Sequence, residues 1–438
     1  MGGRSSGLSL DERFELCRSV GCECIEDGEL RNLLDKKPNP ICYDGFEPSG
    51  RMHIAQGILK AINVNKLTSS GCTFVFWVAD WFALLNNKMG GNLKHIRLVG
   101  RYMIEVRHAK VLALLLLLLA LIRMVASAQV WKACGMDMER VVFLWSSDEI
   151  NKHPDQYWSL VIDIARAFNL TRVKRCSQIM GRQAGDDMPA AQILYPCMQC
   201  ADIFFLKADI CQLGLDQRKV NMLARDYCSH IKRKFKPIIL SHRTISAHTH
   251  VPRERGVPLP LGLGSLSLRA VCTAMMPGLG KGEEKMSKSK PDSAIFMEDD
   301  EKTVISKINK SYCPPRQIRA NPCIEYLRHI VFPRLNTLTV VRDDASGGNR
   351  CRLSLSLSSC RNPVAFCSLT FICAADRTYT SIAEVEEEFE RGLLHPGDLK
   401  KALAAALNEL IRPVREHFQN NPEAKKLLAE VKKLKITR

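Results

Sequence analysis

The sequence predicts an α/β protein in which a parallel-sheet domain comes first and a smaller, all-helical domain follows. Two observations lead to this prediction. From Ile41 to Asp80 the chain passes through a strand-like apolar run, a loop, a segment with helical spacing of apolar residues and a second strand-like run. This order is typical of a β-loop-α-β unit with parallel strands. After about Ile305 the apolar residues recur at helical spacing instead.

The composition indicates a globular chain of two or three domains. The 438 residues are 46% hydrophobic and 25% charged, which excludes a disordered or collagen-like protein. The 18 cysteines occur in a long chain that begins without the apolar run of a signal peptide, so we expect free thiols in the reducing cytoplasm. The leucine-rich run at residues 111–122 is shorter than the roughly 20 apolar residues that a membrane helix needs, and we expect no membrane partner.

Three tracts differ in composition from the rest of the chain. Residues 107–130, 243–274 and 351–375 are rich in Leu, Ser, Gly or Pro, and they hold nine basic residues but a single acid, Glu254. They supply about half of the net charge of +17, which weakens charge as evidence for nucleic-acid binding. We interpret the tracts as insertions, with translated non-coding sequence as one origin. Ordinary surface loops are the alternative.

The loop of the β-loop-α-β unit leads into a helix with a histidine in its first turn. The first strand, ICYDGF, is followed by EPSGRM, and His53 then begins the helical segment. In such units ligands bind at the carboxyl ends of the strands, where backbone N–H groups at the helix start attract an anion. His53 can donate a hydrogen bond to charge that develops on a phosphate. The alternative is a structural histidine, which is the commoner role at a helix start.

A lysine-rich loop far downstream is a second candidate for phosphate binding. Residues 285–289 read KMSKS within a polar, glycine-containing stretch. Two lysines and two serines at this spacing can close over a triphosphate, neutralise its charge and hydrogen-bond its oxygens. Such a loop alone is more often a solvated surface, but its pairing with the histidine element favours phosphoryl chemistry.

The two elements together resemble the paired signatures of class I aminoacyl-tRNA synthetases. Residues 53–56, HIAQ, are similar to the HIGH signature, and KMSKS matches its signature letter for letter. Gln56 departs from the pattern, because a second histidine is often found there. The resemblance implies a Rossmann-like nucleotide-binding catalytic domain in which His53, Lys285 and Lys288 are catalytic. It also implies that ATP, accompanied by Mg²⁺, is bound by Gly50, His53, Gln56, Lys285, Met286, Ser287, Lys288 and Ser289.

A third segment, residues 193–202, places polar side chains at helical spacing among apolar residues. Pro196 predicts that a helix begins there, so Tyr195, Gln199 and Asp202 share one face. A solvated stripe is the alternative. The flanking sequence ADIFFLKADI favours burial, however, and buried polar groups need partners.

Cys197 and Cys200 form a CxxC within this segment. A structural zinc site needs a second pair of ligands at suitable spacing, and the other cysteines offer none. We therefore expect the two thiols to pack as small apolar groups, and we expect no metal site.

The same segment resembles the tyrosine pocket of tyrosyl-tRNA synthetases of the archaeal and eukaryotic type. By this resemblance Tyr43 and Asp202 hold the phenolic hydroxyl of tyrosine, while Tyr195, Gln199 and Gln217 hold its α-amino group. A site that hydrogen-bonds a hydroxyl rejects phenylalanine, because its own polar groups would be left unpaired. Tryptophan activation is a disfavoured alternative, since an indole offers these groups no hydroxyl.

The family implies a two-step reaction. The carboxylate of L-tyrosine attacks the α-phosphate of ATP, which gives tyrosyl-adenylate and pyrophosphate, and the tyrosine is then transferred to tRNA(Tyr). The substrates supply the nucleophile and the leaving group, so the protein contributes positioning and charge stabilisation. The alternative is a catalytically impaired, insertion-bearing variant that only binds RNA or a partner.

The resemblance also implies a division into domains. Residues 1–35 would form an N-terminal helical segment, residues 36–304 the catalytic domain and residues 305–438 an anticodon-binding domain. In the last of these, the sequence SIAE at residues 381–384 predicts a capping box with Gly392 as the stop, and a leucine stripe at residues 398–411 predicts a helix that Pro413 ends. A homodimer is expected unless the tract of residues 107–130, in a region that relatives use for dimer contacts, disrupts it.

The tract of residues 243–274 separates a strand-like segment from the KMSKS loop, so its removal tests the insertion hypothesis. We expect a chain without residues 243–274 to have at least the activity of the full chain in tyrosine-dependent ATP–pyrophosphate exchange. A loss of exchange on deletion, with an unchanged circular dichroism spectrum, would show that the tract contributes to the site.

Overall fold

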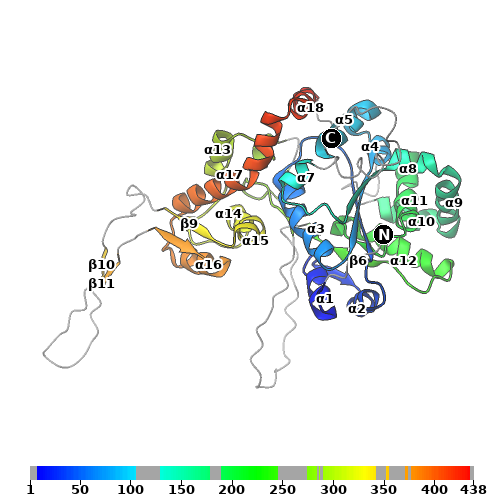
Figure 1. The fold of residues 1–438 in the computed structure, drawn as a ribbon, viewed down its shortest axis with the longest axis horizontal. Helices are drawn as coiled ribbons and strands as arrows, with labels where there is room; N and C mark the ends of the chain where they lie inside the picture. Colours follow the sequence, from blue (N-terminus) through cyan, green and yellow to red (C-terminus); the bar gives the residue numbers. More distant parts are fainter. Residues whose placement is uncertain are drawn as a thin grey trace, which may run out of the picture. The chain divides into compact units, whose positions relative to one another are not determined.

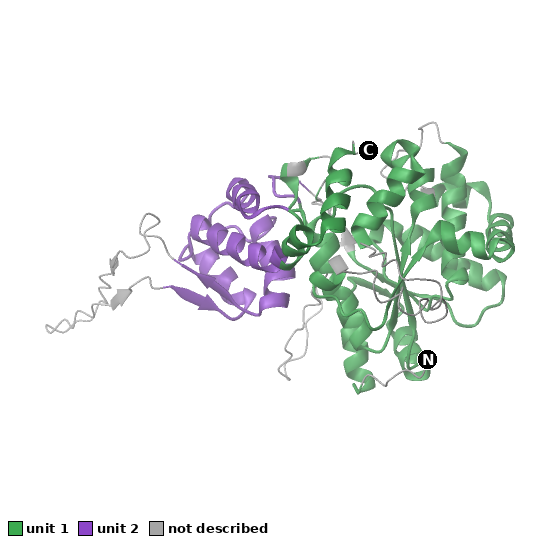
Figure 2. Cartoon of the chain, turned by 45° about the horizontal axis from the view of Figure 1, so that its top comes forward, with its two compact units in different colours: residues 1–277, 284–298, 413–438 green, residues 278–283, 299–412 purple. Residues whose placement is uncertain are grey.

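The computed structural model describes residues 7–104, 129–177, 189–244, 274–283, 286, 290–341, 352–354, 370–372 and 376–434. It contains two compact units (Figure 2): unit 1 comprises residues 1–277, 284–298 and 413–438, and unit 2 comprises residues 278–283 and 299–412. The units divide the chain differently from the predicted domains, because residues 413–438 group with unit 1. Most of the three unusual tracts lies outside the described residues, so their interpretation as insertions stays a prediction.

Unit 1 contains a six-stranded sheet with the strand order β1-β6-β5-β2-β3-β4. Strand β6 of this sheet is labelled in Figure 1. Strands β2 to β6 run parallel, and β1 is antiparallel to β6. The predicted α/β class is therefore confirmed. The strands are β1 Glu23–Ile25, β2 Ile41–Phe46, β3 Thr73–Val78, β4 Val141–Trp145, β5 Ile210–Cys211 and β6 Ile238–Ser241. A separate parallel pair joins β7 Arg243–Thr244 to β8 Ala274–Met275.

Helices cover both faces of this sheet. Successive side chains of a strand point to opposite faces: Phe76 of β3 stacks on Trp131 of α7 with ring centroids 5.2 Å apart, whereas Trp77 meets Phe205 of α11 at 6.2 Å. This explains why β3 reads as an unbroken apolar run. Within the described chain, no helix is both long enough and apolar enough to cross a membrane.

The helical elements of unit 1 are, in chain order, α1 Leu10–Arg18, α2 Asp27–Lys36, η1 Ala55–Leu59, α3 Lys60–Ser69, α4 Asp80–Leu85, η2 Lys88–Gly91, α5 Leu93–Ile104, α7 Gln129–Ala133, α8 Ser146–Lys152, α9 Pro154–Ala167, α10 Leu170–Ser177, α11 Ala190–Phe205, η4 Leu215–Gln217, α12 Arg218–His230, η5 Pro291–Ser293 and α18 Pro422–Lys433.

The predicted β-loop-α-β unit is confirmed. Strands β2 and β3 pair in parallel from Ile41–Thr73 to Phe46–Val78, and the connection passes through one π-helical segment, η1, before α3. Gly71, just beyond α3, has a φ of +98°, a conformation that glycine adopts without the steric cost of a side chain.

The predicted start of the third helix at Pro196 is wrong. Helix α11 begins at Ala190, after Pro189 at its N-cap, and Pro196 lies inside it. Pro196 has no N–H to donate to the carbonyl of Gln192. Dense packing outweighs that loss, since most residues from Pro196 to Ile203 are buried. The predicted sharing of one face by Tyr195, Gln199 and Asp202 is unaffected, because all three lie within α11.

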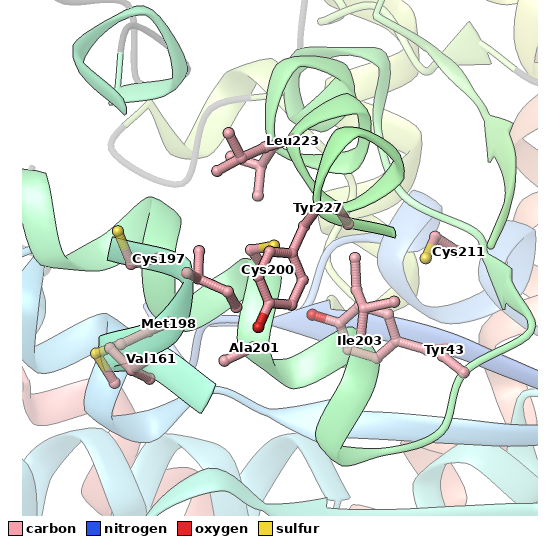
Figure 3. Packing of buried hydrophobic residues seen from close by; sticks show 14 of the residues in the cluster. Tyr43, Val161, Cys197, Met198, Cys200, Ala201, Ile203, Cys211, Leu223 and Tyr227 are labelled. Atoms are coloured by element: carbon pink, nitrogen blue, oxygen red, sulfur yellow. The ribbon is translucent and has the colours of Figure 1, made fainter. Parts of the chain in front are cut away.

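One apolar cluster holds α11 against its neighbours (Figure 3). It combines Val161 of α9 and Leu223 of α12 with Tyr43 of β2. Cys197 and Cys200 belong to this cluster, with exposed fractions of 3% and 0%. Burial raises the pKa of Cys197 to about 11 and that of Cys200 well above its usual value, so both remain neutral thiols that pack as apolar groups.

Unit 2 is mostly helical, with a short antiparallel pair of strands, β9 and β12, in addition. A further antiparallel pair joins β10 to β11. The elements are α13 Glu301–Lys310, α14 Pro322–Tyr326, η6 Leu327–Val331, α15 Phe332–Leu335, β9 Leu338–Val340, β10 Arg352–Ser354, β11 Thr370–Ile372, β12 Arg377–Tyr379 and α16 Ile382–Arg391. Helix α17 Pro396–Asn420 begins in unit 2, and its residues from Pro413 belong to unit 1.

The predicted ends of α16 are confirmed, but the predicted end of α17 is wrong. Ser381 accepts a hydrogen bond from the backbone N–H of Glu384, and Gly392 ends α16 with a φ of +76°. Pro413 lies inside α17, which continues to Asn420. The residues after Pro413 still bury an apolar stripe, including Val414 and Phe418, and this burial offsets the missing backbone hydrogen bond.

Asp80 joins the ends of two strands, and its removal should destabilise unit 1. It is fully buried and accepts hydrogen bonds from Ser146 Oγ at 2.7 Å, Ser147 Oγ at 2.6 Å and Ser147 N at 3.0 Å. Asp80→Ala leaves these donors buried without an acceptor, so we expect a loss of about 3 kcal/mol in the free energy of unfolding.

Urea denaturation followed by circular dichroism measures this loss. Asp148→Ala is the matched control, because Asp148 is 45% exposed, and its removal should cost at most about 1 kcal/mol. Equal losses in the two variants would contradict the role given to Asp80.

Candidate active site

A cavity of about 670 Å³ opens where the parallel strands of unit 1 end. Its walls include residues 43–47 at the end of β2 and His242 after β6. The ends of β3 and β5 add Phe76, Trp77, Ala79, Leu213, Gly214, Asp216 and Gln217. Chain connections run in opposite directions from β2 and β5. At such a switch point the helices diverge, which leaves a crevice at the carboxyl edge of the sheet.

The cavity brings together most of the site residues that the sequence predicts. Its lining includes all five predicted tyrosine-binding residues and three predicted nucleotide-binding residues, namely Tyr43, Tyr195, Gln199, Asp202, Gln217, His53, Gln56 and Met286. Gly50 is buried in the loop after β2, with a φ of +141°, and does not line the cavity. Lys285, Ser287, Lys288 and Ser289 lie outside the described residues.

A buried carboxyl group and a buried phenol, those of Asp202 and Tyr43, line one part of the cavity. Asp202 is 1% exposed and Tyr43 is equally buried. Burial raises the pKa of Asp202 well above its usual value, and a hydrogen bond from Tyr157 OH to Asp202 Oδ1, 2.8 Å long, opposes that rise. Burial, with Asp202 nearby, raises the pKa of Tyr43, so this phenol keeps its proton and can donate it in a hydrogen bond.

A glutamine pair and a carboxylate form another part of the lining. Gln199 Nε2 donates to Gln217 Oε1 at 3.1 Å, and Tyr195 OH donates to Glu47 Oε1 at 2.9 Å. Within the part of the chain that the structure describes, the buried Oε1 of Gln199 has no hydrogen-bond partner. Buried polar atoms are normally paired, so this oxygen and the Glu47 carboxylate can accept hydrogen bonds from an ammonium group.

The histidine predicted from the sequence lies where the segment before η1 meets a distant strand-like segment. His53 forms a β-bridge with Phe296, flanked by hydrogen bonds from Ile54 N to Ile295 O and from Met297 N to Met52 O. The backbone N–H of Gln56 donates to His53 O at 2.9 Å and lies 3.4 Å from His53 Nδ1, a contact that is compatible with a proton on Nε2. His53 can therefore donate from that nitrogen to a bound anion.

A polar chain that sequence reasoning missed lies beside the cavity. Lys60 forms an ion pair with Asp44 and donates to Gln212 Oε1 at 2.6 Å, and Gln212 Nε2 lies 3.0 Å from His242 Nδ1. Burial, with Lys60 nearby, lowers the pKa of His242 to about 3. No spacing pattern connects these residues, because they come from four separate segments of the chain.

Glu47 and Tyr157 are two further residues that the sequence reasoning did not select. Glu47 lies in the loop after β2. The feature that could have identified it as a site residue is its proximity to His53 in the sequence. Tyr157 lies in α9, 45 residues before Asp202, and its helical spacing is that of an ordinary core residue.

Comparisons with known proteins connect this site to a family. The family model of the class I tRNA synthetases (W and Y) matches residues 35–412. Tyrosine–tRNA ligase 1, cytoplasmic, of Arabidopsis thaliana is 50% identical over 98% of this chain and 90% of its own length. Tyrosine–tRNA ligase 2, cytoplasmic, of the same plant is 49% identical over 99% of this chain, which spans 48% of that protein.

Solved structures agree with these matches. The tyrosyl-tRNA synthetase of Leishmania major in complex with tyrosinol has a TM-score of 0.71 at 44% identity, and the match covers 98% of this chain and 61% of that one. The tyrosyl-tRNA synthetase of Pyrococcus horikoshii complexed with L-tyrosine has a TM-score of 0.70 at 28% identity, over 97% and 100% of the two chains.

The fold and the cavity define an α/β protein that binds a small molecule at the carboxyl edge of a parallel sheet. With the matches above, the chain belongs to the class I tRNA synthetases for tryptophan and tyrosine, and within them to the tyrosyl-tRNA synthetases.

The low pKa of His242 predicts a pH-dependent stability. The folded protein holds His242 neutral down to a pKa of about 3, whereas an unfolded chain binds the proton near pH 6.5. The contribution of this pKa shift to the free energy of unfolding is therefore fully present above about pH 6.5. It decreases as the pH falls towards the pKa of His242 in the folded protein. The side chain of His242→Gln cannot titrate. We therefore expect the melting temperature of this variant to fall less than that of the wild type between about pH 7 and about pH 4.

Thermal unfolding across this pH range tests the prediction. The exposed His95 provides the control, because His95→Gln should leave the wild-type pH profile unchanged. Parallel profiles for wild type and His242→Gln would show that His242 does not contribute to the acid sensitivity.

Proposed function

We propose that this chain is a tyrosine–tRNA ligase that activates L-tyrosine with ATP and then transfers it to tRNA(Tyr). The observation that carries the proposal is the cavity itself, which combines the buried Asp202 and Tyr43 with the open acceptor of Gln199. A phenol and an ammonium group are the two ends of tyrosine, and each has a complementary set of groups here. The relatives named for tyrosine, and solved with tyrosinol or L-tyrosine, support this assignment.

In this proposal the pocket positions the amino acid for attack on ATP. Tyr43 and Asp202 bind the phenolic hydroxyl, and Tyr195, Gln199 and Gln217 bind the ammonium group. The carboxylate of tyrosine is then free to attack the α-phosphorus, which forms a P–O bond to tyrosine and releases pyrophosphate. Holding two reactants in line replaces an unfavourable encounter in solution and is the main contribution such a site makes.

The phosphate end of the site is proposed from the signatures and from the place of His53. His53 Nε2–H is assigned to stabilise charge that builds on the phosphates, together with the lysines of the KMSKS segment. We assign the nucleotide to Gly50, Gln56, Met286, Ser287, Ser289, Lys285 and Lys288. Mg²⁺ is proposed to enter with ATP as part of the substrate.

Partners and location are proposed by analogy with the relatives. We propose that the chain works in the cytoplasm, as the names of the Arabidopsis ligases state for those proteins. We also propose a homodimer and assign residues 305–438 to anticodon binding. Basic side chains of the last helices, such as Lys400, Arg412 and Lys425, are candidates for contacts with tRNA phosphates.

Tyrosine-dependent ATP–pyrophosphate exchange by the purified chain tests the proposed function. We expect exchange with tyrosine and none above background with tryptophan, because an indole leaves Asp202 and Tyr43 without a hydrogen-bonding partner. A folded chain that exchanges with neither amino acid would contradict the proposal, and exchange with tryptophan alone would reverse the specificity.

A substitution at Asp202 tests the pocket assignment. Asp202→Ala should lower kcat/KM for tyrosine by about a hundredfold or more, because the buried carboxyl group that forms a hydrogen bond with the substrate's hydroxyl is lost. The KM for ATP should change less than about threefold. Equal losses for the two substrates would show that Asp202 supports the fold rather than the tyrosine pocket.

A further inference from the structure

Tyr157 donates a hydrogen bond to Asp202, whose carboxyl group lines the cavity. Its hydroxyl lies 2.8 Å from Asp202 Oδ1, and the carbonyl of Met198 is a more distant acceptor at 3.2 Å. Asp202 lines the cavity, whereas Tyr157 does not. Tyr157 therefore contacts Asp202 from outside the cavity in which an amino acid would bind.

The position of this hydroxyl is set by aromatic packing. Tyr157 is fully buried, and its ring meets Phe205 of α11 edge-on at 5.2 Å and Trp158 at 5.7 Å. Such edge-to-face contacts favour one orientation of the ring. The ring thus links α9 to α11, and the hydroxyl fixes one oxygen of the Asp202 carboxyl group.

A fixed carboxyl group matters for telling tyrosine from phenylalanine. A hydroxyl is selected strongly only if the site loses hydrogen bonds when the hydroxyl is missing. A carboxyl group that can rotate, or that takes up a proton, can form its hydrogen bonds with protein groups when the substrate has no hydroxyl. With Oδ1 bonded to Tyr157, Oδ2 is the oxygen that this hydrogen bond leaves for the substrate's hydroxyl.

We propose that Tyr157 is a specificity-determining positioning residue, which donates a hydrogen bond to Asp202 so that the second carboxylate oxygen is held ready for the phenolic hydroxyl of the substrate. This inference rests on the proposed tyrosine specificity and goes beyond it, because Tyr157 touches no substrate. It assigns part of the selectivity to a residue outside the cavity.

The charge state of Asp202 provides a second readout. The titratable groups facing it are Tyr157 from α9, Tyr43 from β2, and Tyr195 and Cys200 from α11, and burial raises the pKa of each. They therefore stay neutral near neutral pH. The side chains of Tyr157 and Trp77 favour the charged form of Asp202 and oppose the rise in its pKa that burial causes, so loss of the Tyr157 bond should shift the pH dependence of tyrosine selection to higher pH.

The test compares Tyr157→Phe with the wild type in exchange assays with tyrosine and with phenylalanine. We expect kcat/KM for tyrosine to fall about tenfold to a hundredfold, which corresponds to one hydrogen bond to a charged group. The value for phenylalanine and the KM for ATP should each change less than about threefold. The pH dependence of the tyrosine preference should lie at higher pH in the variant than in the wild type.

Tyr326→Phe is the matched control for loss of a buried phenolic hydroxyl. Tyr326 lies in unit 2, is fully buried, and its hydroxyl has no hydrogen-bond partner among the residues that the structure describes. This variant should keep the wild-type preference for tyrosine. Melting temperatures of both variants show whether the fold is retained.

A double-mutant cycle asks whether Tyr157 acts through Asp202. In an Asp202→Asn background, Tyr157→Phe should change the ratio of tyrosine to phenylalanine binding, measured by equilibrium dialysis, less than about twofold. An unchanged preference in the single Tyr157→Phe variant, or an equally large effect without the aspartate, would overturn the inference.

The same experiments separate this inference from the proposed function. A wild type that binds tyrosine selectively but catalyses no exchange would contradict the ligase activity, and the dialysis ratios would still decide the role of Tyr157. A wild type that binds neither amino acid would overturn both.

Discussion

The parallel pairing of β2 with β3 on one side and β5 on the other is the constraint on which the site depends. Five consecutive residues of the chain, Tyr43 to Glu47, line the cavity at and just after the end of β2. Since connections leave β2 and β5 in opposite directions, helices leave the carboxyl edge open. Residues of α11 and η4 then approach the same edge from the other side of the switch point.

A carboxyl group in the apolar core is the costly part of this arrangement. Asp202 lies on a helix whose neighbouring residues Ala201 and Ile203 are fully buried, and an unpaired charge there would be strongly unfavourable. The hydrogen bond from Tyr157 offsets part of that cost. A site that excludes water in this way makes the presence or absence of one substrate hydroxyl energetically significant.

Backbone pairing joins two segments that are far apart in the sequence. The main-chain hydrogen bonds between residues 52–54 and residues 295–297 tie the segment that bears His53 to the segment that follows the KMSKS loop. His53 therefore lies just before η1, in a β-bridge, and not in the first helical turn that the sequence predicts. Buried side chains strengthen this junction, because Glu298 pairs with Arg51 and accepts a hydrogen bond from Tyr102 OH at 2.9 Å. The segment that bears His53 and residues 295–298 are thereby joined within unit 1.

The sequence by itself determined the α/β class, the β-loop-α-β unit and the residue types of the pocket. The class and the unit follow from local periodicity, because a helix face or a strand run is set by neighbours a few residues away. The choice of Tyr43 and Gln217, and the roles of the pocket residues, came from the resemblance to a known family. Reasoning from local periodicity found that Tyr195, Gln199 and Asp202 share a face, although it misplaced the start of their helix at Pro196. The error at Pro413 has the same origin, since tertiary burial outweighed a local stop signal.

Only the tertiary structure decided which distant groups meet. Tyr157 reaches Asp202, His242 reaches Gln212, and Phe296 reaches His53 through pairings between separate helices and strands. No sequence spacing encodes such contacts, because they depend on how whole elements pack around the sheet. The motifs therefore indicate the chemistry, and the packing determines which residues orient the groups that perform it.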